Sequence, residues 1–141
     1  MLRLPLGSVT VLLGPGLARR RVMAQLVEDS ARCSTGHGAV SATRITADPT
    51  DTVSQRRTAL DTARNAGAGV VLVDRFTDGL SSEDRRGLLQ EVRRLAEDGR
   101  AVLVDDVDPV AALAVAANAL RIDRARGLVL EPLDEPGYLA S

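Results

Sequence analysis

Acidic side chains follow two aliphatic runs of this sequence. Asp74 closes the first run, and Asp105, Asp106 and Asp108 come directly after the second. Carboxylates at the ends of neighbouring strands could hold a divalent cation through oxygen ligands. The alternative is that Asp108 caps a helix and the other three form ion pairs. Because no histidine lies near these acids in the sequence, we expect no resident metal, with Asp74, Asp105 and Asp106 as the weak candidates for holding one.

A glycine-rich turn precedes a cluster of arginines. Gly14-Pro15-Gly16 separates an apolar run from a helical pattern, and Arg19, Arg20 and Arg21 lie in the first turns of that helix. The N–H groups at a helix N-terminus attract anions, and nearby cations add to that attraction. The sequence therefore offers a relaxed anion site. The alternative is a structural turn whose arginines are paired with acids.

A thiol and an imidazole also lie close together, at Cys33 and His37. A Cys/His nucleophile pair needs a third group to orient it and an oxyanion hole. The sequence indicates neither, so we interpret residues 30–38 as a solvated loop. The paired arginines at 56–57, 85–86 and 93–94 are interpreted as solvated helix faces balanced by nearby acids.

Composition narrows the functional classes. All 18 basic residues are arginine, and the net charge is −1, which argues against a general nucleic-acid binder. Phe76 and Tyr138 are the only aromatic residues, so the core must be aliphatic. One cysteine cannot form a disulfide within the chain. The apolar runs are shorter than the ~18 residues of a membrane span, so we expect a cytoplasmic protein without direct membrane insertion.

Apolar strands and amphipathic helices alternate along most of the chain. The expected strands are Ser8–Leu13, Ala39–Ala47 at a sheet edge, Val70–Val73 and Ala101–Val104, then a hairpin of Leu120–Ile122 and Leu128–Leu130. The expected helices are Leu17–Glu28, Thr52–Asn65, one that starts with Glu83 and Asp84 after Ser81 and Ser82, and a heavily buried one over Val110–Ala119. Such alternation implies right-handed crossovers and a mainly parallel sheet. We expect a single domain over residues 1–131 and a flexible, acidic, proline-containing tail over 132–141.

The stretch from Gly69 to Asp84 resembles the Walker B and D-loop segment of ABC-type ATPase domains. In that family an apolar strand ends in Asp-Glu and leads to a loop ending Gly-Leu-Asp. The residues that match are Asp74, Thr77, Gly79 and Leu80. Arg75 stands where the family has its catalytic glutamate, and Ser81 stands where it has the D-loop aspartate. Asp74 is therefore Walker B-like, and Gly79, Leu80 and Ser81 are D-loop-like.

The turn at Gly14 resembles a degenerate Walker A loop of the same family. A working loop needs glycines that let the backbone wrap the phosphates, a lysine for the β- and γ-oxygens and a Ser/Thr for Mg²⁺. Leu17 and Arg19 occupy glycine positions, Arg20 the lysine position and Arg21 the position of the Mg²⁺ ligand. Arg20 keeps the charge, but its planar fork is not equivalent to an ammonium group. The vestigial nucleotide- or anion-binding residues that the resemblance implies are Gly14, Pro15, Gly16, Arg19, Arg20 and Arg21.

Other family features are reduced or missing. Val53–Arg57 stands in the place of the signature run Ser-Gly-Gly-Gln and keeps only Ser54 and Gln55. The stretch between Gly14 and Ser54 is too short to hold the family's helical subdomain. The family's N-terminal antiparallel sheet is absent or truncated. The resemblance is therefore to a miniature ABC domain.

The end of the chain follows the family's closing pattern of a strand, a helix near His-Asp-Pro and a hairpin centred on Asp-Arg-Gly. The matching segments are Ala101–Val104, Asp108-Pro109 and Ile122–Leu128, with Val107 in the register of the histidine. If the family's topology carries over, the Ala101 strand lies between the Ser8 and Val70 strands. Three cations at a helix start oppose the helix dipole. One of Arg19, Arg20 and Arg21 should therefore lie within ion-pair distance of Asp74, Asp105 or Asp106.

The resemblance implies a three-layer, P-loop-like α/β fold with a mainly parallel sheet and a C-terminal β-hairpin. Of the residues that perform the family's chemistry, only Asp74 is in place. We therefore expect a non-catalytic ABC-ATPase-like module, without cofactor, that acts through protein–protein interaction. It would act as a homodimer, or as an accessory or regulatory partner of a transporter permease or an intact ATPase. The alternative is an ATP-binding protein or ATPase subunit of an ABC transporter with atypical Walker motifs, which would bind ATP and Mg²⁺.

Overall fold

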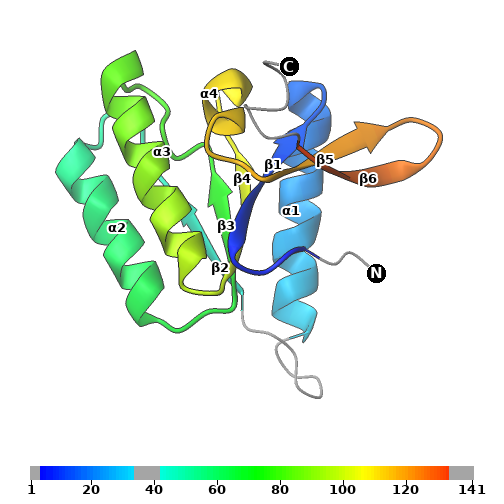
Figure 1. The fold of residues 1–141 in the computed structure, drawn as a ribbon, viewed down its shortest axis with the longest axis horizontal. Helices are drawn as coiled ribbons and strands as arrows, with labels where there is room; N and C mark the ends of the chain where they lie inside the picture. Colours follow the sequence, from blue (N-terminus) through cyan, green and yellow to red (C-terminus); the bar gives the residue numbers. More distant parts are fainter. Residues whose placement is uncertain (1–3, 34–41, 134–141) are drawn as a thin grey trace, which may run out of the picture.

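The computed structural model describes residues 4–33 and 42–133, which form alternating strands and helices (Figure 1). The elements, in chain order, are β1 Ser8–Leu13, α1 Gly16–Cys33, β2 Ala42–Thr46, α2 Val53–Asn65, β3 Val70–Asp74, α3 Ser82–Glu97, β4 Ala101–Asp105, α4 Pro109–Leu113, β5 Asn118–Asp123 and β6 Gly127–Pro132. The alternation that the sequence predicts is confirmed, because the first four strands each lead into a helix and the last two form a hairpin.

The sheet has six strands in the order β2-β3-β4-β1-β5-β6. All neighbours are parallel except β5 and β6, which form the predicted antiparallel hairpin. β4 lies between β1 and β3, as expected from the family topology. β2 is an edge strand, also as predicted, although residues 39–41 of the expected strand lie outside the described residues.

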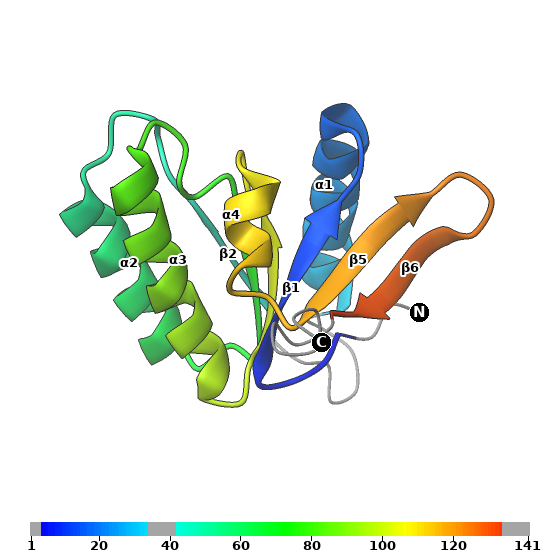
Figure 2. The ribbon, with the colours of Figure 1, turned by 45° about the horizontal axis from the view of Figure 1, so that its top comes forward.

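Helices cover both faces of the sheet and make three layers. α2, α3 and α4 lie on one face and α1 on the other, as Figures 1 and 2 both show. The larger core cluster lies under the three helices and includes Val73, Phe76, Leu88 and Val104. The smaller cluster lies under α1 and includes Leu12, Met23, Leu103 and Leu120. Both clusters are almost entirely aliphatic, as the scarcity of aromatic residues requires.

Local signals position the helix ends. Thr52 caps α2 in a capping box, in which its hydroxyl accepts from Gln55 N and the Gln55 side chain accepts from Thr52 N. Ser81 caps α3, and Asp108 caps α4 with Pro109 at the first helical position. Gly99, after α3, has a φ of 92°, the left-handed conformation that ends many helices.

Two helix boundaries differ from the sequence prediction. α1 continues to Cys33 through residues expected to be loop, because Ala31 and Arg32 favour helix. α4 is much shorter than the predicted helix and ends at Leu113, and the prediction that it is heavily buried is wrong, since only Ala112 of its residues is buried. The chain beyond it is taken up by the sheet, since Ala117 N donates to Val9 O and β5 begins at Asn118. Pairing with β1 therefore overrides the helix propensity of an alanine-rich segment.

The predicted tail begins within the fold. Pro132 is the last residue of β6, and Leu133 N donates to Ala117 O at 2.9 Å. The rest of the predicted tail, residues 134–141, lies outside the described residues.

Candidate functional site

The carboxyl ends of three adjacent strands meet where α1 begins. Asp74 at the end of β3 lies beside Asp105 at the end of β4 in the parallel register. β4 pairs with β1, which leads through Gly14 and Pro15 into α1. The turn is closed by Arg19 N, which donates to Pro15 O at 2.9 Å. The fold therefore brings the Walker A-like and Walker B-like residues to one edge of the sheet, as the resemblance implies.

Arg19 fills the space between the turn and the strand ends. Its Nη1 lies 2.8 Å from Asp105 Oδ1 and donates to Asp106 O at 2.9 Å. The Arg19 side chain is 16% exposed and that of Asp105 only 3%. The predicted ion pair between the arginine cluster and the strand-end acids is thus confirmed for Arg19. Arg20 and Arg21 are exposed.

Two other arginines face the Walker B-like carboxylate. Arg44, on β2, donates to Asp74 Oδ2 through both Nε (3.1 Å) and Nη2. Arg75 Nε lies 3.5 Å from Asp74 Oδ1. The backbone of Arg75 has a φ of 49°, and its N–H donates to Asp105 O at 2.7 Å. Positive φ at a non-glycine residue is uncommon and must be held by such contacts. The resemblance placed Arg75 here, but it gave no indication of Arg44.

Burial makes the two acids after β4 costly to ionise. It raises the pKa of Asp105 above its ordinary value, the Arg19 guanidinium opposes this, and the Asp74 carboxylate adds to it. Burial also raises the pKa of Asp106, against hydrogen bonds from Asp108 N and Thr77. Each carboxylate is therefore tolerated because donors are positioned around it.

Thr77 lies at the centre of a buried polar chain. Its hydroxyl is 2.8 Å from Asp106 Oδ1 and accepts from Arg85 Nε at 3.0 Å. Arg85 Nη1 also lies 3.7 Å from Asp108 Oδ2, and Asp108 Oδ1 accepts from Ala111 N at 3.2 Å as the cap of α4. The expectation that Asp108 serves as a helix cap is confirmed. Arg85, predicted to be solvated, instead ties α3 to this chain of contacts.

The D-loop-like residues form a tight turn into α3. Gly79 has a φ of 83°, and a Cβ there would lie 2.3 Å from Pro49 O, so no larger residue fits. Leu80 is half-buried against the larger core, and Ser81 Oγ accepts from Asp84 N at 3.2 Å. These residues position the loop, and Ser81 acts here as a helix cap.

Arg56, like Arg44 and Arg85, has a role that sequence reasoning missed. It is 1% exposed, which makes the prediction of a solvated 56–57 pair wrong at this position. Its guanidinium donates to five backbone carbonyls, those of Asp48, Pro49, Asp51, Phe76 and Asp78. The available signal was its spacing, because Arg56 shares a helix face with the buried residues Leu60 and Ala63. The expected exposed start of α2 holds for its neighbours Ser54 and Gln55.

These residues do not fit Mg²⁺-ATP. Leu17 and Arg19 carry side chains where phosphate binding needs bare backbone, and the Asp74 carboxylate is already paired with two arginines. Among the residues that the structure describes, no group of three or more His, Cys, Asp or Glu could hold a metal ion. A cavity of about 240 Å³ remains, lined by Gly16, Arg19, Arg20, Arg75, Asp105, Asp106 and Val107. It is smaller than the ~300–1,000 Å³ of ordinary small-molecule pockets.

The structure does not test the Cys33/His37 pair. Cys33 ends α1, and His37 lies outside the part of the chain that the structure describes. A Cys/His nucleophile therefore stays a sequence-level alternative.

Comparison with solved structures finds proteins of similar fold. No protein-family model matches the chain, and no curated protein matches it in sequence. The structure entitled "RNase-L Inhibitor" matches with a TM-score of 0.60 and 14% identity over 97% of this chain and 37% of that one. The structure of the ATP-binding subunit of an ABC transporter matches with a TM-score of 0.58 and 10% identity, over 94% of this chain and 82% of the other.

The chain has an ABC-like fold. A third match is the archaeal ribosome recycling factor aABCE1 in complex with the ribosomal stalk protein aP1, with a TM-score of 0.55 and 12% identity. It covers 95% of this chain and 39% of that one, so the chain spans well under half the length of two of these three relatives. At such identities the likeness concerns the fold alone. Within the described residues, no helix is long and apolar enough to cross a membrane.

Proposed function

We propose that this chain is a degenerate, miniature ABC-like domain that neither hydrolyses ATP nor binds it, and that acts through contacts with another protein. The partner would be a transporter permease, an intact ATPase or a second copy of the chain. The proposal rests on an ABC-like fold in which side chains of the chain itself occupy the carboxyl edge of the sheet, between the Walker A-like turn and Asp74. We call this the phosphate edge.

The observation that carries the proposal is the position of Arg19. Its guanidinium lies between the Gly14 turn and the strand ends, where it donates to the Asp105 carboxylate and to the carbonyl of Asp106. Phosphate binding would have to expel this side chain and leave the buried Asp105 carboxylate unpaired, which is costly. Mg²⁺ would in addition have to displace Arg44 and Arg75 from Asp74.

Protein contacts of the relatives support the second half of the proposal. One similar structure is the complex of aABCE1 with the stalk protein aP1, and another is a model of ribosome-bound archaeal Pelota and ABCE1. The Pelota–ABCE1 structure matches with a TM-score of 0.51 and 11% identity over 85% of this chain and 28% of that one. ABC-like domains thus occur in protein assemblies, and a domain without nucleotide chemistry could keep that part of the role.

The first experiment measures nucleotide binding and turnover on the purified chain. A ligand at 100 times its Kd would add about 2.7 kcal/mol to the free energy of unfolding. We expect no Mg²⁺-dependent rise in the unfolding temperature with ATP and no phosphate release. A turnover on the order of 1 s⁻¹ that disappears in Asp74→Asn would reject the proposal.

The second experiment measures binding of the chain to a partner protein and to itself. Genes beside that of this chain are searched for a permease or an intact ATPase, the chain is titrated against any such protein, and binding is followed by calorimetry. Sedimentation of the chain alone measures self-association. We expect a complex or a dimer that forms equally well with and without Mg²⁺-ATP. A chain that stays monomeric and unbound in both assays would contradict the proposed role.

One observation favours a second candidate, an ATP-binding protein with atypical Walker motifs. The cavity beside Arg19 is lined by the exposed arginines Arg20 and Arg75 next to the start of α1. If phosphate groups bound there, the same thermal titration would give a rise with ATP that is lost in Arg20→Ala.

A further inference from the structure

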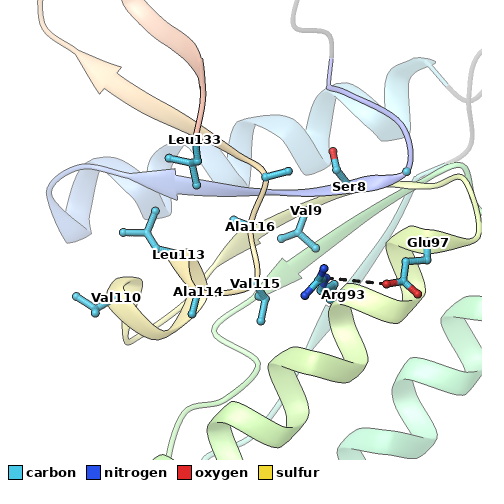
Figure 3. A pocket seen from close by; sticks show the side chains of 12 residues that line it. Ser8, Val9, Arg93, Glu97, Val110, Leu113, Ala114, Val115, Ala116 and Leu133 are labelled. Atoms are coloured by element: carbon cyan, nitrogen blue, oxygen red, sulfur yellow. Dashed lines mark ion pairs between the residues drawn. The ribbon is translucent and has the colours of Figure 1, made fainter. Parts of the chain in front are cut away.

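An open groove lies on the α4 side of the sheet, away from the phosphate edge. It has a volume of about 740 Å³ and is walled by α3, α4 and the segment that joins α4 to β5. Figure 3 shows Val110 and Leu113 on one side, Val115 at the centre and Arg93 with Glu97 on the other side. The wall is mainly aliphatic with one cation, and we call it the α4 groove.

The described chain ends on the wall of this groove. Leu133 lines it, and Leu133 N donates to Ala117 O, which belongs to another lining residue. The chain then continues with the sequence Asp-Glu-Pro-Gly-Tyr-Leu-Ala-Ser over residues 134–141. At ~3.3–3.6 Å per extended residue, a segment of this length reaches about 26–29 Å. Residue 134 therefore follows directly on a residue of the groove wall, and the segment can extend this far from Leu133.

We propose that residues 134–141 of the same chain dock in the α4 groove. The chemistry of the two surfaces is complementary. Tyr138 and Leu139 bring apolar surface to a wall that includes the 76%-exposed Val110. Covering such surface is favourable in proportion to the apolar area removed from water.

Charge adds to this match at the other side of the groove. The acids Asp134 and Glu135 come first in the segment, and Arg93 is a cation of the wall. Arg93 Nε lies 3.9 Å from Glu97 Oε1, and both side chains are more than half exposed. Such a surface pair contributes little, so a carboxylate of the docked segment can share Arg93.

The sequence supplies a reporter for the test. Tyr138 is the only tyrosine, and there is no tryptophan, so the intrinsic emission of the protein comes from Tyr138. Acrylamide quenching is measured on the full chain and on the free peptide DEPGYLAS. We expect a several-fold smaller quenching constant in the full chain, because docking shields the phenol ring.

A pair of matched variants assigns the shielding to the groove. Val110→Asp places a negative charge on the groove wall, and Leu17→Asp makes the same change at another exposed apolar residue, 62% exposed. Both are the second residue of their helix, on α4 and α1, where an acid is compatible with the helix dipole. We expect Val110→Asp to raise the quenching constant to that of the peptide and Leu17→Asp to leave it low.

Amide hydrogen exchange gives an independent measurement. Removal of residues 134–141 should speed exchange in 110–117, and the added peptide should restore protection. Equal quenching of the full chain and the free peptide, with no change in exchange on truncation, would overturn the inference. Shielding that is lost on dilution, together with a dimer in sedimentation, would also overturn it, because the segment would then dock in a second copy.

Discussion

Arg19 and Arg56 both bury a guanidinium in this small domain, but they meet different partners. Arg19 reaches across the carboxyl edge of the sheet to the carboxylate of Asp105, with one carbonyl beside it. Arg56 meets five backbone carbonyls from two loops, and among the described residues none of its hydrogen bonds involves a carboxylate. The first arginine neutralises a buried charge, while the second supplies donors to backbone that no strand or helix satisfies.

This difference separates the site where we propose that nucleotide chemistry is lost from the contacts that maintain the ABC-like fold. At Arg19, a cation of the chain itself pairs with Asp105 beside the Walker A-like turn. At Arg56, the loop 48–51 is tied to the turn at Phe76 and Asp78, so the D-loop-like segment keeps its shape. The loops of this ABC-like fold are thus held by backbone hydrogen bonds to a buried arginine.

The largest effect is expected for Arg56→Ala. Hydrogen bonds from a charged donor contribute about 1.5–3 kcal/mol each, so losing several should lower the free energy of unfolding by about 3–5 kcal/mol. Urea denaturation measures the change. Arg57→Ala is the control, since Arg57 is exposed and pairs only with Glu91 among the described contacts, and it should leave the midpoint almost unchanged. Equal losses in the two variants would show that Arg56 is not a structural clamp.

The next effect is that of Arg19→Met. It leaves the Asp105 carboxylate buried without its cation and should cost about 2–3 kcal/mol, less than the ~3–5 kcal/mol of a fully buried pair because Arg19 is partly exposed. Adding Asp105→Asn removes the stranded charge and should recover more than half of the loss. If the double variant recovers no stability, the contribution of Arg19 to stability does not come from its ion pair with Asp105. Arg20→Ala, at an exposed neighbour, is the control.

The two arginines should also differ in pH dependence. Burial raises the folded pKa of Asp105 and Asp106 above the unfolded value. The folded state therefore binds more protons, and their contribution to stability is present below the unfolded pKa and lost as pH rises through the folded pKa. In Arg19→Met the pKa of Asp105 rises further, so the cost of that variant should shrink from pH 7 to pH 4.

The cost of Arg56→Ala should stay nearly constant over the same range, because carbonyl oxygens do not titrate. The Arg56 charge helps to lower the pKa of Asp48, but this acid is exposed and its pKa is lowered mainly by hydrogen bonds with Thr50. Denaturation curves of the two variants and the parent chain between pH 4 and pH 7 test both expectations. Parallel curves for all three proteins would contradict the assignment of charge pairing to Arg19 alone.

The smallest effect is expected for Arg19→Lys. A lysine keeps the positive charge beside Asp105, so the loss should be well below that of Arg19→Met. Arg56→Lys should lose most of what Arg56→Ala loses, since an ammonium lacks the planar fork that reaches five acceptors. Thermal unfolding measures the stability of the two lysine variants. Similar losses of stability at both positions would show that Arg19 and Arg56 do not differ in what their guanidinium groups provide.

Much of the fold could be predicted from local pattern. β1 was predicted with its observed bounds, and the caps at Ser81 and Asp108 and the hairpin at Gly127 were also correct. The failure at Val110–Ala119 has a physical cause, because alanine-rich composition favours helix while the free edge of β1 offered hydrogen bonds to Asn118 and its neighbours. Propensity is local, and strand pairing is not.

The sequence by itself determined which residue types stand at the Walker-like positions, because Gly14–Arg21, Asp74 and Arg75 can be read without coordinates. It also indicated that one arginine of the cluster would need an acidic partner. Only the tertiary structure decided that this arginine is Arg19, that Arg44 forms an ion pair with Asp74, and that Arg56 is buried. A guanidinium on a long, rotatable side chain finds its acceptors among segments distant in sequence, so their identity depends on how the layers pack.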